Sequence, residues 1–414
     1  MDYRIREKIK TWIIFLLVAI LFTVLIIKGI RYNIYAEKEE AKNAERINAE
    51  LEKDTCRTEE EIYNRLEKAI MDNTQDNVYI RVPATYSQED LTEIAKKIDP
   101  FLGHVTQTTY ATSTQRDGDG PEIKDEYAGI NYKYVKNDDY YVYEELIEGK
   151  DIPAEQTKAT QLKNVCEKFL NENINSSMSE YDKELAIHDY IVNGCTYGFS
   201  DAKDDTEFEA YGALVNHKAV CEGYAEATYL LLKLCNIESK LIEGHTNSKN
   251  AADSSNPDGG GTDGVLETDS GKKIDGHMWN QVLIDGSWYH LDTTWDDPIS
   301  STPTLEHTYF NVNDMIIGKN HEWDKSTAQS CTSMTSNYYE KNDKYFLEDT
   351  SFKNYVKEVL AGGSREPITC AVANADLSQE AMYFIFDYDG ISNYIIYKNG
   401  VDGFMIVRLE FNQQ

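Results

Sequence analysis

Val220-Cys221-Glu222-Gly223-Tyr224-Ala225 decides the predicted fold, because it places a cysteine where a helix should begin. Apolar spacing predicts that this helix runs to about Leu234 and that a strand follows over 239–243. A helix N-terminus stabilises negative charge, which favours the nucleophilic thiolate form of Cys221. Gly223 is expected to remove side-chain bulk where a substrate would approach. Taken alone, Cys221 is better read as a small buried apolar residue, as is Cys235.

Two segments downstream read as the strands of one hairpin, with Asp285-Gly286 as a two-residue turn between them. The segments are Gly276-His277-Met278-Trp279-Asn280 and Trp288-Tyr289-His290-Leu291-Asp292. The turn sets a register with three pairs: Ile284 with Ser287, Trp279 with Asp292, and His277 with Thr294. His277 and Asp292 then share one face of the sheet as diagonal neighbours, about 7–8 Å apart at the backbone. An imidazole–carboxylate hydrogen bond can span that separation.

Thiol, imidazole and carboxylate are the parts of a thiol-dependent acyl-transfer site. We predict that Cys221 attacks an acyl carbon and that its backbone N–H is the first donor to the oxyanion, with the second donor unassigned. His277 would take the thiol proton and later donate it to the leaving amine, while Asp292 fixes the tautomer and orientation of His277. His290 is a rival base, but a weaker candidate than His277 because it lies beside Asp292 in the chain, and His245 is a second rival.

Structural interpretations stay open for several neighbouring residues. His188 is expected to be a partly buried structural histidine, in a helix that begins at Ser179 with a capping box. Asp292, Asp296 and Asp297 could form a cation site, although Asp297 precedes a proline and more plausibly shapes a turn. The seven cysteines include no CxxC pair, so a zinc framework is not expected, and we predict no metal and no cofactor.

Taken together, the motifs resemble the bacterial transglutaminase-like superfamily over about 179–323. That resemblance implies a papain-like arrangement, in which a helix carrying the nucleophile packs on an antiparallel sheet carrying the other two residues. It also implies Cys221, His277 and Asp292 as the triad. The insertion at 247–275 departs from the pattern and is expected to be a plain loop, with a lid as the alternative. Further segments carry the resemblance: Tyr211-Gly212-Ala213-Leu214, Thr293-Thr294-Trp295-Asp296-Asp297-Pro298, Tyr309-Phe310 and His321.

The charge balance and the N-terminus suggest where the chain works. Asp and Glu total 72 against 41 Lys and Arg, a net charge of −31, which argues against nucleic acid as a partner. Residues 11–27 carry no charge and follow a basic segment, so we predict a membrane-spanning anchor with a cytoplasmic N-terminus and the rest of the chain outside. A cleaved signal peptide is the alternative, but Ile34-Tyr35-Ala36 is a poor cleavage site.

The predicted fold class is α+β, with an N-terminal transmembrane helix and a papain-like core between two small α/β units. We predict an anchor over 1–35, a charged, exposed helical spacer over 36–75, a β-α-β-β unit over 76–150, the core over 151–335, and an α+β unit over 336–414. The expected elements of the two small units are strands at 78–82, 130–135 and 140–147, a helix at 87–102, a loop at 112–126, a helix at 352–360, a mixed segment at 378–386, and strands at 368–373, 394–397 and 404–411, the last two separated by Asn399-Gly400.

The predicted function is cysteine-dependent acyl transfer on peptide or glutamine amide bonds, through a thioester. The resembling family includes transglutaminases, peptidases, amidases and inactive members, so the resemblance does not choose the reaction. We favour hydrolysis, because water is the default acceptor. The expected partners are a protein or peptide substrate at the cell surface and the membrane. The alternative is a non-catalytic surface scaffold that retains the fold.

Overall fold

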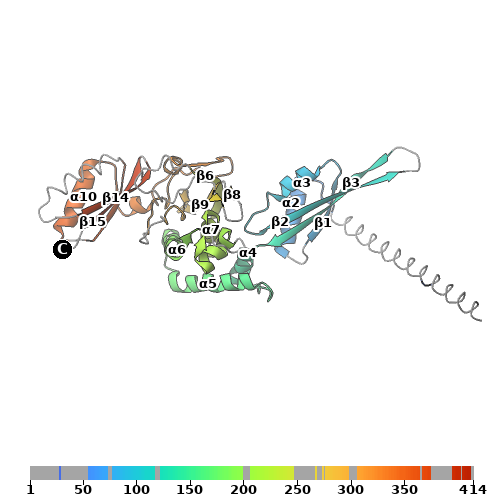
Figure 1. The fold of residues 1–414 in the computed structure, drawn as a ribbon, viewed down its shortest axis with the longest axis horizontal. Helices are drawn as coiled ribbons and strands as arrows, with labels where there is room; N and C mark the ends of the chain where they lie inside the picture. Colours follow the sequence, from blue (N-terminus) through green and yellow to red (C-terminus); the bar gives the residue numbers. More distant parts are fainter. Residues whose placement is uncertain are drawn as a thin grey trace, which may run out of the picture. The chain divides into compact units, whose positions relative to one another are not determined.

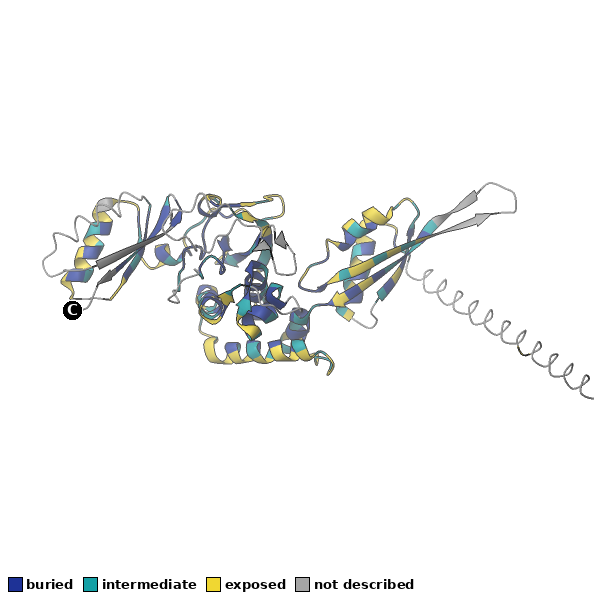
Figure 2. Cartoon of the chain, viewed as in Figure 1, coloured by how far each residue is buried: buried dark blue, intermediate teal, exposed yellow. Residues whose placement is uncertain are grey.

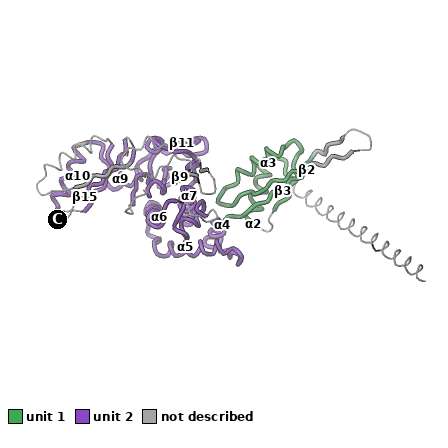
Figure 3. The backbone as a smooth tube through the Cα atoms, viewed as in Figure 1, with its two compact units in different colours: residues 1–137 green, residues 138–414 purple. Residues whose placement is uncertain are grey.

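The computed structural model describes residues 28, 55–72, 77–116, 122–198, 206–246, 266–267, 273–274, 276–297, 305–363, 366–373, 394–401 and 403–411. The chain divides into two compact units, residues 1–137 and 138–414 (Figure 3). Within the described residues, no helix combines the length and the apolar character that crossing a membrane requires. The predicted anchor at 11–27 and the segment at 378–386 lie outside them, and the predicted boundaries at 150 and 335 stay predictions.

Between residues 55 and 136, the described part of the first unit has a three-stranded antiparallel sheet with the strand order β1-β3-β2 and the helices α2 and α3. Alternate residues of β1 are buried, as expected for a sheet covered on one face. Figure 1 shows both helices beside the sheet. The elements are α2 (Glu59–Asp72), β1 (Asn77–Pro83), α3 (Gln88–Ala95), β2 (Gly103–Arg116) and β3 (Glu122–Lys136).

Three expectations for this region were wrong. Helix α2 is not an exposed spacer, because Ile62, Leu66 and Ile70 on one of its faces are fully buried. The predicted loop at 112–126 is largely strand, because β2 and β3 continue as one long hairpin. The predicted helix at 87–102 ends much earlier, with Ser87 as the N-cap of the eight-residue α3.

The predicted strand at 140–147 is helical instead. It forms α4 (Asp138–Tyr143), which a π-helix (Glu144–Glu148) continues. Consecutive residues Tyr140, Tyr141 and Val142 are all buried, which a strand covered on one face cannot achieve. Two aspartates in the first turn also favour a helix N-terminus over a hairpin turn.

The second unit places helices against a four-stranded antiparallel sheet with the strand order β10-β9-β6-β11. Helix α7 lies beside β9 and β6 (Figure 1), and its leucines at 230–232 are fully buried (Figure 2). The amide of Asn280 in β9 donates to the carbonyl oxygen of Ala225 in α7 at 3.0 Å. The elements are α5 (Thr157–Asn173), α6 (Glu180–Gly194), α7 (Cys221–Leu234), β6 (Ser239–Thr246), β9 (His277–Ile284), β10 (Ser287–Leu291) and β11 (His321–Trp323).

A second four-stranded sheet follows in the same unit, with the order β12-β13-β15-β14. Strand β14 runs through Asn399 and Gly400, so these residues do not separate the two strands as predicted. One apolar cluster joins the two sheets, since Trp279 of β9 and Ile242 of β6 share it with Phe404 of the second sheet. The elements are β12 (Tyr345–Phe346), α10 (Asp349–Ala361), β13 (Ile368–Val372), β14 (Tyr394–Val401) and β15 (Phe404–Phe411).

Candidate active site

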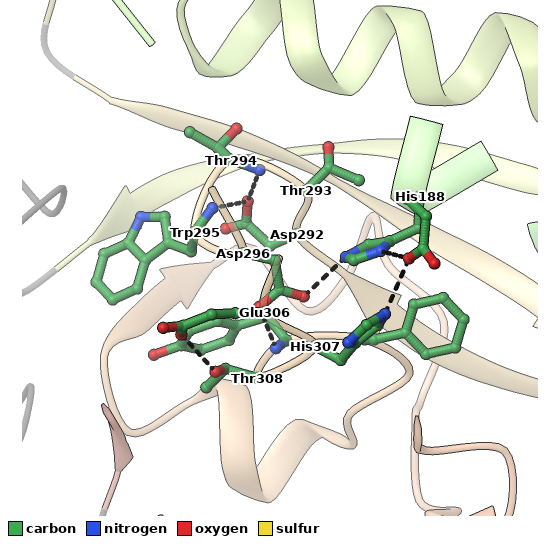
Figure 4. Close-up of polar contacts among 12 residues, drawn as sticks. His188, Asp292, Thr293, Thr294, Trp295, Asp296, Glu306, His307 and Thr308 are labelled. Atoms are coloured by element: carbon green, nitrogen blue, oxygen red, sulfur yellow. Dashed lines mark hydrogen bonds and ion pairs between the residues drawn. The ribbon is translucent and has the colours of Figure 1, made fainter. Parts of the chain in front are cut away.

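The hairpin that carries His277 and Asp292 has the predicted register. Ser287 pairs with Ile284, and the ladder continues to Leu291 and Asn280. Asp285 and Gly286 have φ angles of 49° and 78°, which is the backbone of a type I′ turn. The ladder stops at Leu291 and Asn280, so the expected pairs of Trp279 with Asp292 and of His277 with Thr294 do not form. The chain turns back instead, and the N–H groups of Thr294 and Trp295 donate to Asp292 Oδ1 at 3.0 and 3.1 Å (Figure 4).

Asp292 lies just beyond the end of β10 and is buried, with 1% of its surface exposed. Its Oδ2 atom is 2.7 Å from His277 Nε2 and 3.0 Å from His321 Nε2. Burial opposes the ionised carboxyl, but the His277 charge and the hydrogen bonds from both histidines outweigh burial and lower the pKa of Asp292. Asp292 is therefore ionised at neutral pH, with both of its oxygens engaged.

Cys221 is the first residue of α7, as predicted, and Val220 is the N-cap with an extended backbone. Asp292 occupies His277 Nε2, which leaves Nδ1 for the Cys221 side chain. Burial opposes a charged imidazole, but Asp292 and a side-chain hydrogen bond with Cys221 outweigh burial and raise the pKa of His277 to about 10. His277 is therefore an imidazolium at neutral pH, next to a cysteine at a helix N-terminus.

Aromatic rings fix the orientation of the His277 imidazole. The Trp279 ring stacks on it with a centroid separation of 5.7 Å and an interplanar angle of 22°. The Trp295 ring approaches from another side at 6.1 Å and 61°. The Asp292 hydrogen bond and these two indoles together restrict rotation of the ring.

Gly223 has a different role from the one expected. A Cβ atom built at this position would lie 2.5 Å from the Glu207 carbonyl oxygen and 3.0 Å from the Ala219 side chain. The protein's own backbone therefore fills the space that we assigned to substrate. The glycine allows the first turn of α7 to pack closely against the 3₁₀ turn at Thr206–Phe208.

Gly223→Ala is expected to lower the free energy of unfolding by about 1–3 kcal/mol, the usual cost of overpacking a core. The reason is that the added Cβ would collide with the Glu207 carbonyl oxygen, a backbone atom that cannot rotate away as a side chain can. Urea unfolding followed by circular dichroism measures the change. The control is Gly194→Ala in α6, where an added Cβ meets nothing within 4 Å. Equal stability of wild type and Gly223→Ala would contradict the close packing.

The two rival bases do not face the thiol. His290 Nδ1 accepts from Trp279 Nε1 at 2.9 Å, and His290 Nε2 lies 3.0 Å from Asp314 Oδ1. Since the indole can only donate, His290 carries its proton on Nε2, and burial lowers its pKa despite Asp314. His245 is exposed and pairs with Glu322 of β11, whereas Gly244 pairs with His277. Its side chain therefore lies on the opposite face of the sheet from His277.

His188 is a structural residue, as expected, but it is fully buried rather than partly buried. Its Nδ1 lies 2.9 Å from Asp189 Oδ1 and its Nε2 lies 3.1 Å from Asp296 Oδ2 (Figure 4). Burial opposes the charged ring, but the two carboxylates outweigh burial and raise the pKa of His188 to about 9. Asp296 Oδ1 in turn accepts from the Tyr309 N–H at 2.9 Å. A charged histidine on α6 thus holds the turn that follows Asp292.

Comparison with known proteins shows what this region of the chain resembles. Residues 168–293 match the family model of the transglutaminase-like superfamily. This stretch of the chain is therefore similar to transglutaminase-like proteins. Kyphoscoliosis peptidase from Homo sapiens is 23% identical over 212 residues, which is 47% of this chain and 29% of the relative. The Mus musculus protein is 22% identical over 217 residues, which is 48% of this chain and 30% of that protein. The chain thus spans less than a third of the length of these curated relatives.

The solved structures that match this chain are distant from it. A proposed cysteine protease from Cytophaga hutchinsonii is 13% identical, with a TM-score of 0.24, over 56% of this chain and 74% of that chain. The periplasmic domain of TgpA from Pseudomonas aeruginosa is 11% identical, with a TM-score of 0.20, over 45% of this chain and 65% of that chain.

The aspartates of the turn in the transglutaminase-like core do not converge as a cation site would require. Asp292 faces two histidines, Asp296 faces His188, and Asp297 accepts from the Tyr224 hydroxyl. Within the described residues, three other groups have donor atoms close enough for a metal: His188 with Asp189 and His307, His277 with Asp292 and His321, and His290 with Asp314 and Cys331.

Hydrogen bonding accounts for these three groups. In each of them a histidine ring nitrogen faces a carboxylate oxygen, at 2.7 to 3.0 Å. Such a nitrogen carries a proton, and a metal ligand needs a free lone pair there. At His290 the indole of Trp279 fixes this tautomer, because it already occupies the other nitrogen. These contacts support hydrogen-bonded networks within the transglutaminase-like core.

Two residues near the site carried no usable signal in the sequence. Tyr197 pairs with Ala219 where two short strands run parallel, and Ala219 lies two residues before Cys221 in the chain. Burial and the nearby charges of Cys221 and Asp292 raise the pKa of Tyr197, so it stays a phenol at the site. As one of 29 tyrosines it could not be singled out. His321 was noted only as part of the resemblance, without its contact to Asp292.

Proposed function

We propose that this chain is a cysteine-dependent acyl-transfer enzyme that acts on peptide or glutamine amide bonds, with Cys221, His277 and Asp292 as its triad. The observation that carries the proposal is the placement of His277, which bonds Asp292 through Nε2 and has the Cys221 side chain beside it, with Nδ1 left to face the thiol. The match to the transglutaminase-like superfamily supports the same chemistry. A structural histidine would not need a carboxylate on one nitrogen and a thiol at a helix N-terminus on the other.

The reaction follows from the charges of these groups. The Cys221 thiolate attacks the carbonyl carbon of the amide, and the C=O electron pair moves onto oxygen, close to the Cys221 N–H. Collapse of this intermediate forms the thioester and breaks the C–N bond. The leaving amine takes its proton from His277, which Asp292 holds in position. Neutral His277 then removes a proton from the second acceptor, which attacks the thioester and releases the thiolate.

We propose water as that acceptor, so that the enzyme is a peptidase or amidase rather than a cross-linking transglutaminase. Kyphoscoliosis peptidase, the relative with 23% identity, carries a peptidase name. Incubation with a glutamine-containing peptide and a labelled amine distinguishes the two reactions, because only transamidation incorporates the label. We also propose an extracytoplasmic location, with residues 11–27 as the anchor and a surface protein or peptide as substrate, as the N-terminal sequence indicates.

A non-catalytic scaffold is the second candidate. The observation that favours it is the burial of Cys221, which exposes only 6% of its surface. A substrate carbonyl has to reach this sulfur for any acyl transfer to occur. The two candidates therefore differ in the accessibility and reactivity of one atom.

Alkylation by iodoacetamide across pH tests the proposal directly. In wild type we expect rapid alkylation of Cys221 at neutral pH, because the positively charged His277 ring beside it favours attack by the sulfur. In His277→Ala this assistance is removed, so alkylation of Cys221 at neutral pH should be much slower. Peptide mass spectrometry separates Cys221 from the six other cysteines, all of which are buried. Identical profiles in both proteins, or an unreactive Cys221, would support the scaffold instead.

A further inference from the structure

One oxygen of Asp292 serves two histidines. Oδ2 lies 2.7 Å from His277 Nε2 and 3.0 Å from His321 Nε2, and all three side chains are buried. His321 comes from β11, the short strand at the edge of the sheet, 29 residues after Asp292. The roles given above to Cys221, His277 and Asp292 do not use it.

His321 also has a defined partner on its other nitrogen. Its Nδ1 lies 2.7 Å from Asn320 Oδ1, and Asn320 Nδ2 lies 2.6 Å from the Tyr309 hydroxyl oxygen. The titratable groups that act on His321 are Asp292, His277 and His290. Burial and the charge on His277 outweigh the bond to Asp292 and lower the pKa of His321 to about 4. The two imidazoles on Asp292 therefore differ in charge, since His277 is charged and His321 is neutral at pH 7.

A neutral His321 carries one proton, and the carboxylate decides where it lies. Asp292 can only accept, so the proton is on Nε2, and Nδ1 then requires a donor. The Asn320 amide supplies one if its NH₂ faces His321 and its oxygen faces Tyr309, a 180° rotation that leaves the shape of the amide unchanged. Burial raises the pKa of Tyr309, which keeps the phenol protonated and able to donate to that oxygen. The chain Tyr309–Asn320–His321–Asp292 then has one donor and one acceptor at each contact.

We propose that His321 is a positioning residue of this site, a neutral donor that limits how strongly Asp292 holds the proton of His277. An oxygen that accepts two hydrogen bonds has less electron density for each of them. His277 must keep its proton while the thiolate forms and must release it to the leaving amine. Sharing Oδ2 between two donors favours that release. The inference rests on the proposed function, because the release matters only if His277 acts as an acid.

Nitrogen-15 NMR of the full chain, labelled at histidine, tests this directly, because ring nitrogen shifts distinguish the two tautomers and the imidazolium. We expect His321 to show the neutral Nε2–H form from pH 6 to 8. In His321→Leu, which removes the donor, the pH midpoint of His277 should rise by about half to one unit. In His321→Gln, whose amide nitrogen can occupy the Nε2 position, the midpoint should return towards that of wild type. His245→Gln, an exposed change on the paired strand, is the matched control and should leave the midpoint unchanged.

Two results would overturn the inference. One is an imidazolium or an Nδ1–H tautomer at His321 near pH 7. The other is a His321→Leu protein whose melting temperature falls while the His277 midpoint does not move, which is the behaviour of a merely structural residue. Wild-type protein alkylated at Cys221 tests the proposed function separately. Loss of the thiolate should lower the His277 midpoint, and an unchanged midpoint there would refute the thiolate–imidazolium pair without touching the role of His321.

Discussion

Asp292→Asn is expected to slow acylation of Cys221 by about 10³–10⁴-fold, the loss typical when the base of a triad is left in the wrong tautomer. Thr294 and Trp295 N–H groups fix the oxygen of the new amide on the Oδ1 side. Its NH₂ then faces His277 Nε2, where two donors cannot bond. The imidazole has to move its proton to Nδ1, and it then offers the thiol a donor instead of a base.

The burst of p-nitrophenol from p-nitrophenyl acetate measures this acylation without knowledge of the natural substrate. Cys221→Ala gives the background rate. Asp314→Asn is the matched control, because Asp314 also accepts from a buried histidine, His290, but away from the thiol. A burst in Asp292→Asn as fast as in Asp314→Asn would mean that the Asp292 carboxylate has no part in the chemistry.

His188→Leu is expected to lower the free energy of unfolding by about 3–5 kcal/mol near pH 6, since removal of one partner leaves Asp296 as a fully buried charge without its histidine. His245→Leu, at an exposed histidine, should cost little. Guanidinium unfolding of both variants and wild type at several pH values gives the comparison. A His188→Leu protein as stable as wild type would mean that the buried network carries no net stability.

The pH dependence of this effect has a definite sign. The pKa of His188 rises from 6.5 to about 9 on folding, so its stabilisation is complete below pH 6.5 and is lost as the pH passes 9. The difference in stability between wild type and His188→Leu should therefore shrink by up to about 3 kcal/mol over this range. His277 also has a raised pKa, but it is present in both proteins and cancels in the difference. A difference that stays constant from pH 6 to 10 would show that His188 is not charged in the folded protein.

Local signals in the sequence were sufficient for the parts of the site that lie on one helix or one hairpin. The N-terminus of α7 at Cys221 and the register around Asp285-Gly286 both follow from chemistry within a few residues. The capping box at Ser179 fixed the start of α6 in the same way. Such elements are predictable because their hydrogen bonds close over short distances along the chain.

Contacts between distant segments were not predictable. His321 meets Asp292 only because a three-residue strand pairs with the far end of β6, and no local pattern specifies that pairing. The role of Gly223 was misread because the atom that crowds it, the Glu207 carbonyl oxygen, belongs to another segment. The helix at Asp138–Tyr143 was misread because a run of aromatic residues fits a strand or a buried helix equally well until its surroundings are known.

The apolar cluster that joins the two sheets has a practical consequence for anyone who trims this protein. Trp279 stacks on His277 and donates to His290, while its other neighbours in the cluster include Phe404 and Ile406 near the C-terminus. A recombinant fragment that stops near residue 335 would lack Phe404 and Ile406. It would therefore expose more of Trp279, which orients the imidazole, to solvent. A cut between Asn137 and Asp138, the boundary between the two compact units, keeps Trp279 and its neighbours in the cluster on one fragment.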